Sequence, residues 1–332
     1  MTTGDTNLVF CSPLAPQLHR FLAFKRAAGC RYHEEARELR VLDRFLLTHL
    51  DPQDPVITDA LLRAYLARQG QVSETTRANR LSLIRGLCRF LALEDPRTAV
   101  PPARFLHIQR RTFVPRVLTR EEGRRFLQVC ETLPPGRLSP FSGMVHGTVL
   151  LLLYLTGLRL GEALGLNRED VDLETGVLRI RQAKFGKSRL VPMAPDLTER
   201  MRACQHFLDT RLGLRDPHAC CFPGPRGTRC RAAAVRYAFR KALVRAGIPY
   251  RGPGQGPRLH DLRHSFAVHR LLLWYEQGVD LNAYLPFLAT YLGHVGLAGT
   301  QRYLRLTEDL VGEVTRRHAA RFGHLITERG TP

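Results

Sequence analysis

The sequence predicts a mainly α-helical protein with one small antiparallel β-sheet, in which a purely helical first domain is followed by a mixed α/β second domain. Leucines recur at three- and four-residue steps early in the chain, and a proline-rich break follows them. Only two short later stretches, 177–182 and 189–193, have the turn-separated pattern of strands. A length of 332 residues is comfortable for two domains.

Helical periodicity covers the first predicted domain, residues 1–95. Four leucines share one helix face: Leu39, Leu42, Leu46 and Leu50. Thr58 is expected to cap a second helix that runs through Ala67, because its hydroxyl can accept the first free backbone N–H groups. Ser73 is expected to cap a third helix that runs to about Leu93.

The third of these helices carries a row of arginines: Arg77, Arg80, Arg85 and Arg89. Such a row could lie along the phosphate backbone of a nucleic acid, and the four residues are candidate DNA-binding residues. A solvated helix face is the alternative, and for any single arginine both interpretations stay open.

Residues 96–118 are predicted to form a basic interdomain linker. The stretch that contains them, 94–119, holds four prolines, several arginines and no helical period. Proline disfavours helix in the residue before it and keeps such a stretch extended.

The second predicted domain covers residues 119–332. Thr119 and Glu122 form a capping box that opens its first helix, and 141–156 is apolar enough for a buried helix. Later helices are expected near 196–211, 230–246, 260–277, 283–293 and 308–320.

The charge balance favours a polyanionic partner. Fifty Lys and Arg face thirty Asp and Glu, a formal net charge of +20. Nucleic acid is the polyanion that a basic protein most often meets, whereas solubility alone rarely requires so one-sided a surface.

The cysteines and the N-terminus predict a reduced, cytoplasmic protein. The eight cysteines form no C-x-x-C pair, and the cluster of His218, Cys220, Cys221 and Cys230 lacks the spacing of a zinc site. No signal peptide is expected from the first residues, and the longest apolar run, 149–155, is too short to cross a bilayer.

Arg159 opens a predicted helix, and Glu162 follows one turn later. The forked donors of a guanidinium suit phosphate oxygens, and a neighbouring carboxylate can hold its rotamer. Alone, an Arg–Glu pair at this spacing is more often a weak surface ion pair.

A second candidate stretch is His260-Asp261-Leu262-Arg263-His264. At helical spacing His260, Arg263 and His264 share one face, where histidine can exchange protons while arginine stays charged. The stretch lacks the H-E-x-x-H arrangement, and the arginine would repel a cation, so no metal is expected. His264 is interpreted as a packed structural residue.

Two further candidates are weak when taken singly. His294 follows Leu292-Gly293, and Tyr303 lies nine residues later; a lone helical tyrosine is usually core or interface. Lys184 and Lys187 flank the turn between the two predicted strands, where lysine is ordinarily only solvated.

In order, these motifs resemble the tyrosine recombinase (phage integrase) family. The set is T-G-L-R-x-x-E, K-x-x-K-x-R-x-V-P, H-D-L-R-H-S and L-G-H, then a tyrosine nine residues on, and it spans Thr156 to Tyr303. The resemblance implies a helical, SAM-like core-binding domain at 1–95 and a catalytic domain with a C-terminal tail helix at 119–332.

The resemblance also implies a function: a site-specific recombinase or integrase that cuts and rejoins DNA through a 3′-phosphotyrosyl intermediate. Arg159 and Arg263 would grip the scissile phosphate, Glu162 would support Arg159, and Tyr303 would be the nucleophile. The phosphotyrosyl bond would conserve the energy of the phosphodiester, so that neither a metal nor a nucleotide cofactor is expected.

The remaining matched positions would move protons or hold the phosphate. Lys184 would protonate the departing 5′-oxygen, His260 would assist proton transfer at the tyrosine, and His294 would hydrogen-bond a phosphate oxygen. One departure is that the segment between Arg263 and His294 is longer than in compact Xer-type members, which leaves the subfamily open.

The implied partner is double-stranded DNA with paired inverted binding sites, on which a homotetramer assembles, with no membrane contact. After Tyr303, apolar residues at 306, 310 and 314 suggest a helix that docks on a neighbouring subunit or packs on its own domain. Two other interpretations stay open: a type IB topoisomerase or telomere resolvase with the same chemistry, and a DNA-binding accessory protein without catalysis.

Overall fold

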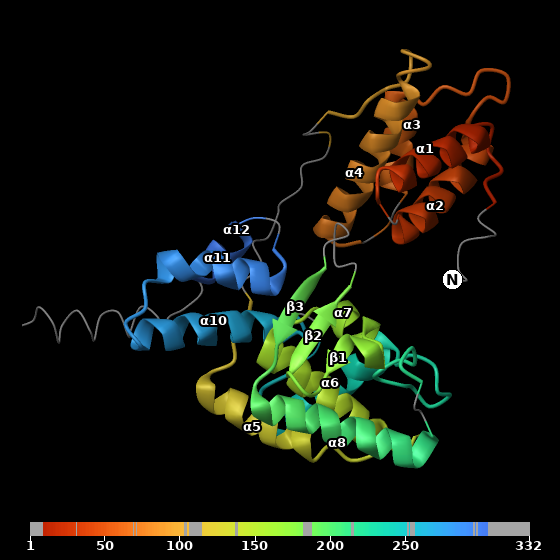
Figure 1. Ribbon diagram of the computed structural model, residues 1–332. Helices are drawn as coiled ribbons and strands as arrows, with labels where there is room; N and C mark the ends of the chain where they lie inside the picture. Colours follow the sequence, from red (N-terminus) through yellow and green to blue (C-terminus); the bar gives the residue numbers. More distant parts are fainter. Residues whose placement is uncertain are drawn as a thin grey trace, which may run out of the picture. The chain divides into compact units, whose positions relative to one another are not determined.

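The computed structural model describes residues 9–30, 32–68, 70, 72–102, 105, 115–136, 139–181, 188–213, 216–250, 252, 256–294, 296 and 298–304. The chain separates into two compact units, Met1–Phe113 (unit 1) and Val114–Pro332 (unit 2), and each has its own hydrophobic core (Figure 1). Unit 1 is helical and unit 2 adds a small antiparallel sheet, which confirms the predicted fold class.

The helices of unit 1 are α1 (Ala15–Ala27), α2 (His33–His49), α3 (Asp59–Ala67) and α4 (Glu74–Leu91). Two of them begin where the sequence predicts. The hydroxyl of Thr58 accepts the backbone N–H of Leu61, and that of Ser73 accepts the N–H of Thr76. These bonds satisfy donors that the first helical turn leaves free.

The segment 96–118, predicted as a linker, is anchored at both of its described ends. The Arg85 guanidinium donates to the carbonyl oxygens of Pro101 and Pro102 at 2.8 and 2.7 Å, within unit 1. Leu118 is fully buried in the core of unit 2. The residues 106–114 lie outside the described ranges, so the predicted linker and domain boundaries stay predictions.

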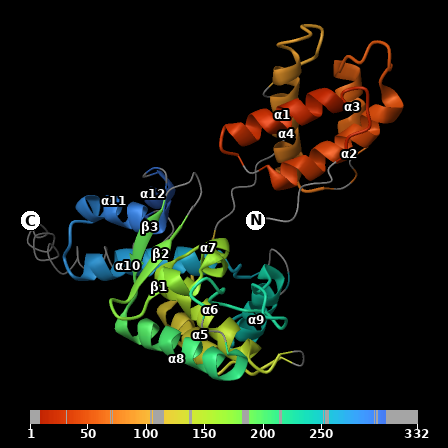
Figure 2. The ribbon, with the colours of Figure 1, turned by 45° about the vertical axis from the view of Figure 1, so that its right-hand side comes forward.

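Unit 2 is built around one apolar helix, which the sequence predicts at 141–156. Its helices are α5 (Arg120–Glu131), α6 (Ser142–Thr156), α7 (Leu160–Gly165), the 3-10 turn η1 (Arg168–Asp170), α8 (Pro195–Leu212), α9 (Ala232–Arg245), α10 (Asp261–Glu276), α11 (Leu281–Leu292) and α12 (Ala298–Leu304). α6 is buried along most of its length and contacts α5, α8, α9 and α10 (Figures 1 and 2).

The sheet has the order β1-β2-β3 with antiparallel neighbours, and its strands are β1 (Val171–Asp172), β2 (Val177–Ile180) and β3 (Arg189–Pro192). Leu178 pairs with Val191, and both side chains face the core, while Arg179 faces outward. The sequence predicts β2 and β3 but not β1, because two residues carry no period. β3 also contacts α11, which brings the sheet beside the site described below.

Helix positions late in the chain agree with the sequence to within two residues for α10 and α11. α12, which carries Tyr303, is not among the predicted helices because its seven residues are too short for a clear period. The helix predicted at 308–320 lies outside the described residues.

Candidate active site

Arg159 is the N-cap residue of α7 and Glu162 lies in its first turn, directly after a tight chain reversal. α6 ends at Gly157, whose φ is +64° and where a Cβ would lie 2.6 Å from the Phe266 ring, so only glycine fits without strain. The Arg159 backbone N–H donates to Glu162 Oε2 at 3.0 Å, and Arg159 Nη1 donates to Oε1 at 2.9 Å. The carboxylate therefore holds both the backbone and the side chain of Arg159.

Glu162 is shared with a second arginine, which sequence reasoning did not single out. Arg189, the first residue of β3, donates from Nη1 and Nη2 to the two carboxylate oxygens at 3.1 and 2.9 Å. Burial by itself would raise the pKa of Glu162, but the hydrogen bonds from Arg189 and Arg159 outweigh it and lower that pKa below its usual range. Glu162 is therefore an anion enclosed by two cations.

His260 and Arg263 lie at the start of α10. Asp261, fully buried, accepts the backbone N–H of Arg258 at 2.8 Å and its Nη2 at 3.0 Å, which secures the entry to the helix. Arg263 is only 2% exposed and donates to the carbonyl oxygens of Gly157 and Leu292, both at 2.7 Å. Burial and the neighbouring Arg159 cation lower the pKa of Arg263 to about 10, so it stays charged near neutral pH.

Three arginines converge on the C-terminal end of α11. The carbonyl oxygens of Tyr291, Leu292 and Gly293 accept, in that order, from Arg189 Nε at 2.8 Å, Arg263 Nη2 at 2.7 Å and Arg159 Nη2 at 3.3 Å. A helix C-terminus presents free carbonyl groups and partial negative charge, which suits cations. This convergence brings together α7, β3 and α10, three elements that are distant in the sequence.

His294 and Tyr303 complete the cluster. His294 Nδ1 lies 2.7 Å from the hydroxyl of Thr300, and its ring stacks on the Tyr303 ring with centroids 6.0 Å apart. Tyr303 is 2% exposed, and the Arg263 guanidinium donates a hydrogen bond to its side chain. The nucleophile candidate and both arginine candidates therefore lie in one site within a single chain.

The His264 ring packs against the rings of both His260 and Tyr303, with centroid distances of 4.9 and 5.4 Å. Its buried Nδ1 has no hydrogen-bond partner among the described residues. Burial and the neighbouring His260 lower the pKa of His264 to about 4, and burial with the nearby Arg263 does the same for His294. These imidazoles are neutral near pH 7, as expected beside fixed cations.

The depressed histidine pKa values predict acid sensitivity of unit 2. The unfolded chain protonates histidine near pH 6.5, whereas folded His264 binds that proton only near pH 4. Its contribution to stability is therefore complete above pH 6.5 and is lost as the pH falls toward 4. We expect the free energy of unfolding in urea, measured between pH 7.5 and 4.5, to depend less steeply on pH in His264→Phe than in the wild type. The difference in slope should be up to about 1.4 kcal/mol per pH unit. Equal slopes for the two proteins would contradict the assignment.

Lys184 lies in 182–187, outside the described residues. On α4, Arg80 donates to both oxygens of Glu38, and Arg85 donates to the carbonyls of the segment that follows α4. Arg77 pairs with Glu74, while Arg89 is exposed. Two of the four predicted DNA contacts thus hold unit 1 together, and the DNA-binding role of this row stays a prediction.

α9 has a basic face that the sequence analysis missed. Its exposed residues include Arg236, Tyr237, Arg240, Lys241 and Arg245, together with the apolar Ala233 and Val244. Its inward residues are Val235, Ala238, Phe239, Ala242 and Leu243. Among the described residues none of these four cations pairs with a carboxylate. The repeat of cations at four-residue steps was the available signal.

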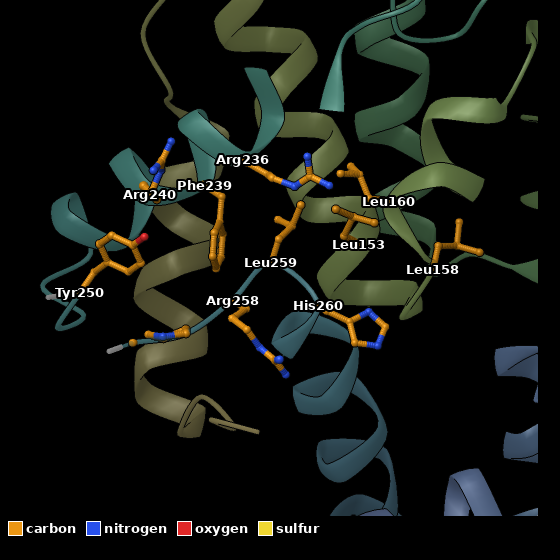
Figure 3. Close-up of a pocket in the computed structure, with 12 residues that line it drawn as sticks. Leu153, Leu158, Leu160, Arg236, Phe239, Arg240, Tyr250, Arg258, Leu259 and His260 are labelled. Atoms are coloured by element: carbon orange, nitrogen blue, oxygen red, sulfur yellow. The ribbon is translucent and has the colours of Figure 1, made fainter. Parts of the chain in front are cut away.

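A cavity of about 450 Å³ lies between α9 and the start of α10 (Figure 3). Arg236 and Arg240 of α9 line one side of the cavity. Arg258 and His260, which directly precede α10, line another side. Two of the α9 cations, Arg236 and Arg240, therefore line the same cavity as His260.

Two negative findings apply only to the described part of the chain. No helix in it is long and apolar enough to cross a membrane. No group of three or more His, Cys, Asp or Glu side chains in those same ranges is arranged to hold a metal ion.

Known proteins are similar to this chain in sequence and in fold. Residues 116–309, more than half of the chain, match the phage integrase family. The chain is 33% identical over 304 residues to the "Putative integrase/recombinase y4rB" of Sinorhizobium fredii, covering 90% of this chain and 95% of that one. It is 32% identical over 226 residues to the tyrosine recombinase XerA of Thermococcus kodakarensis, covering 68% and 69%.

Among solved structures, a post-cleavage complex of the XerH site-specific recombinase with palindromic difH substrate has the same fold. It matches with a TM-score of 0.62 at 17% identity, over 90% of this chain and 94% of the other. The Tn1549 transposon integrase in complex with transposon right end DNA matches with a TM-score of 0.61 at 19% identity, over 91% and 99%. By the family match and the identity to its relatives, this chain belongs to the phage integrase family and is a tyrosine recombinase, an enzyme of site-specific DNA recombination.

Proposed function

We propose that the chain cuts and rejoins double-stranded DNA through a 3′-phosphotyrosyl intermediate at Tyr303. The observation that carries the proposal is the contact between the Tyr303 side chain and Arg263, beside an Arg159 that the same helix end supports. Two guanidinium groups offset the charge that repels a nucleophile from a phosphodiester. They do so most strongly in the transition state, when charge builds on the non-bridging oxygens.

In the proposed cleavage step the Tyr303 oxygen bonds to phosphorus and the bond from phosphorus to the 5′-oxygen breaks. His260 accepts the phenolic proton; its pKa is lowered by burial and by Arg263, so the ring is neutral and free to take it. Lys184 gives a proton to the departing 5′-oxygen. Religation reverses each transfer, with a 5′-hydroxyl attacking and Tyr303 leaving.

His294 is proposed to hydrogen-bond a non-bridging phosphate oxygen. Its Nδ1 is next to the Thr300 hydroxyl, and when that hydroxyl donates, the proton of His294 resides on Nε2. Nε2–H is then the donor for the phosphate. The energy of the broken bond is kept in the phosphotyrosine, so the proposed reaction uses neither a nucleotide nor a metal.

The proposed substrate is DNA with paired inverted sites, bound by a homotetramer. A lambda integrase tetramer bound to a Holliday junction shares the fold, with a TM-score of 0.60 at 18% identity. Strand exchange between two duplexes breaks four strands, and each break requires one Tyr303.

A nicked suicide substrate tests the proposal. The short strand released at the nick diffuses away, so the proposed enzyme accumulates a covalent adduct that survives denaturing electrophoresis and maps to the peptide with Tyr303. A DNA-binding accessory protein gives no adduct. A two-site recombination assay beside a plasmid relaxation assay separates a recombinase from a topoisomerase, which relaxes a plasmid that has a single site.

The basic face of α9 is proposed as a DNA contact, in addition to the row of arginines on α4. We expect Arg236→Gln with Arg240→Gln to weaken DNA binding and to reduce the slope of log Kd against log salt concentration by about two, because two phosphate contacts are lost. The control is Arg124→Gln with Arg202→Gln, since these exposed arginines pair with Glu121 and Glu199. Equal slopes in the two double variants would show that only net charge matters.

A further inference from the structure

All three nitrogens of the Arg189 guanidinium donate hydrogen bonds within the protein. Its side chain is 10% exposed, its Nη1 and Nη2 donate to Glu162, and its Nε donates to the carbonyl of Tyr291. Arg159 is 31% exposed and shares the same carboxylate. Of the two arginines on Glu162, Arg159 is therefore the one able to reach a bound phosphate.

The sharing of Glu162 determines how much charge Arg159 presents. Each carboxylate oxygen accepts two hydrogen bonds, one from Arg159 and one from Arg189. Two cations on one anion leave a net charge of +1, whereas Arg159 and Glu162 alone would cancel. Without Arg189, the fork of Arg159 would be free to close on the carboxylate in a bidentate pair, which is the preferred geometry of such ions.

Arg189 also connects two structural elements of the site. It belongs to β3, but its Nε holds the end of α11, just before His294. Its guanidinium packs over Gly293, where a Cβ would lie 2.8 Å from Nη1. The position of this helix end in turn sets the carbonyls that receive Arg159 and Arg263.

We propose that Arg189 is a positioning residue for DNA cleavage: it takes a share of Glu162 and anchors the end of α11, so that Arg159 faces the scissile phosphate with its charge intact. This proposal rests on the proposed function, because it requires a phosphate between Arg159 and Arg263. Arg189 itself does not touch the DNA.

The test compares two suicide substrates with the full chain under single-turnover conditions. One has an ordinary scissile phosphodiester, and in the other a methylphosphonate replaces it, so that a methyl group removes the negative charge of one non-bridging oxygen. Arg189→Met should slow adduct formation roughly 100-fold on the phosphodiester but less than about 10-fold on the methylphosphonate, because the neutral centre depends less on a correctly placed cation. DNA binding, measured by mobility shift, should change less than about threefold.

Arg159→Met is the positive control. Its rate of adduct formation should also fall less on the methylphosphonate than on the phosphodiester. Arg124→Met removes an exposed arginine of α5 and should react like the wild type on both substrates. Arg189→Lys keeps a cation beside Glu162 but cannot make all three hydrogen bonds. Its rate of adduct formation should therefore lie between those of Arg189→Met and the wild type. If Arg189→Met does not fold, the two substrates are compared with Arg189→Lys instead.

A loss of equal size on both substrates would overturn the proposal, since it would mean that Arg189 only supports folding. Wild-type rates in Arg189→Met would overturn it as well. Neither result affects the proposed function, which fails instead if the wild-type chain forms no adduct on the phosphodiester.

Discussion

Tyr303→Phe should abolish the covalent protein–DNA adduct while leaving DNA binding nearly unchanged. The substitution removes one oxygen, and the ring can keep its place between His264 and His294. Because that oxygen forms the bond to phosphorus, the rate should fall by at least about 10⁴-fold, below detection on a suicide substrate. The loss of one hydrogen bond with Arg263 should cost only about 1 kcal/mol of stability.

The matched control is Tyr291→Phe. Tyr291 also lies in unit 2, and its hydroxyl donates to the carbonyl of Pro192 at 3.2 Å. This variant should form adduct at close to the wild-type rate, which shows that the loss of a tyrosine hydroxyl as such is harmless. Adduct from Tyr303→Phe would mean that another side chain attacks the phosphate, and the assignment of the nucleophile would be wrong.

The sequence predicts the elements of the site better than their connections. The fold class follows from local patterns, and so do the bounds of α10 and α11, because amphipathic period and capping residues are local signals. The order of the motifs was sufficient to select the residues that the structure brings together around Arg263. Their roles stay proposals, and Lys184 lies outside the described residues.

What the sequence could not show depends on long-range partners. Arg189 reaches the Tyr291 carbonyl across 102 positions, and Arg80 reaches Glu38 across 42. The helical periodicity of the sequence places Arg80 on a helix face, but it does not show whether a carboxylate or a DNA phosphate lies opposite that face. Short elements such as α12 have too few residues for any period, and their conformation is set by packing.

The second large effect is expected at Arg263, where charge and shape can be separated. Arg263→Lys keeps the cation, but an ammonium group is a point charge that cannot reach the carbonyls of Gly157 and Leu292 and a phosphate together. We expect adduct formation to slow by roughly 10³-fold. Buried carbonyl groups that lose their donors should also lower the free energy of unfolding by about 2 kcal/mol.

The measurement is single-turnover adduct formation at several salt concentrations, with urea unfolding to confirm that the variant is folded. Arg124→Lys on α5 is the control, since it makes the same exchange at an exposed position outside the proposed DNA contacts and should react at the wild-type rate. Lower salt strengthens the general attraction to DNA but cannot replace the forked donors of the guanidinium. The slow adduct formation of Arg263→Lys should therefore persist at low salt. If low salt restored the rate, Arg263 would be acting as one charge among many. Because this side chain is buried with both carbonyl contacts in place, we expect geometry to decide the outcome.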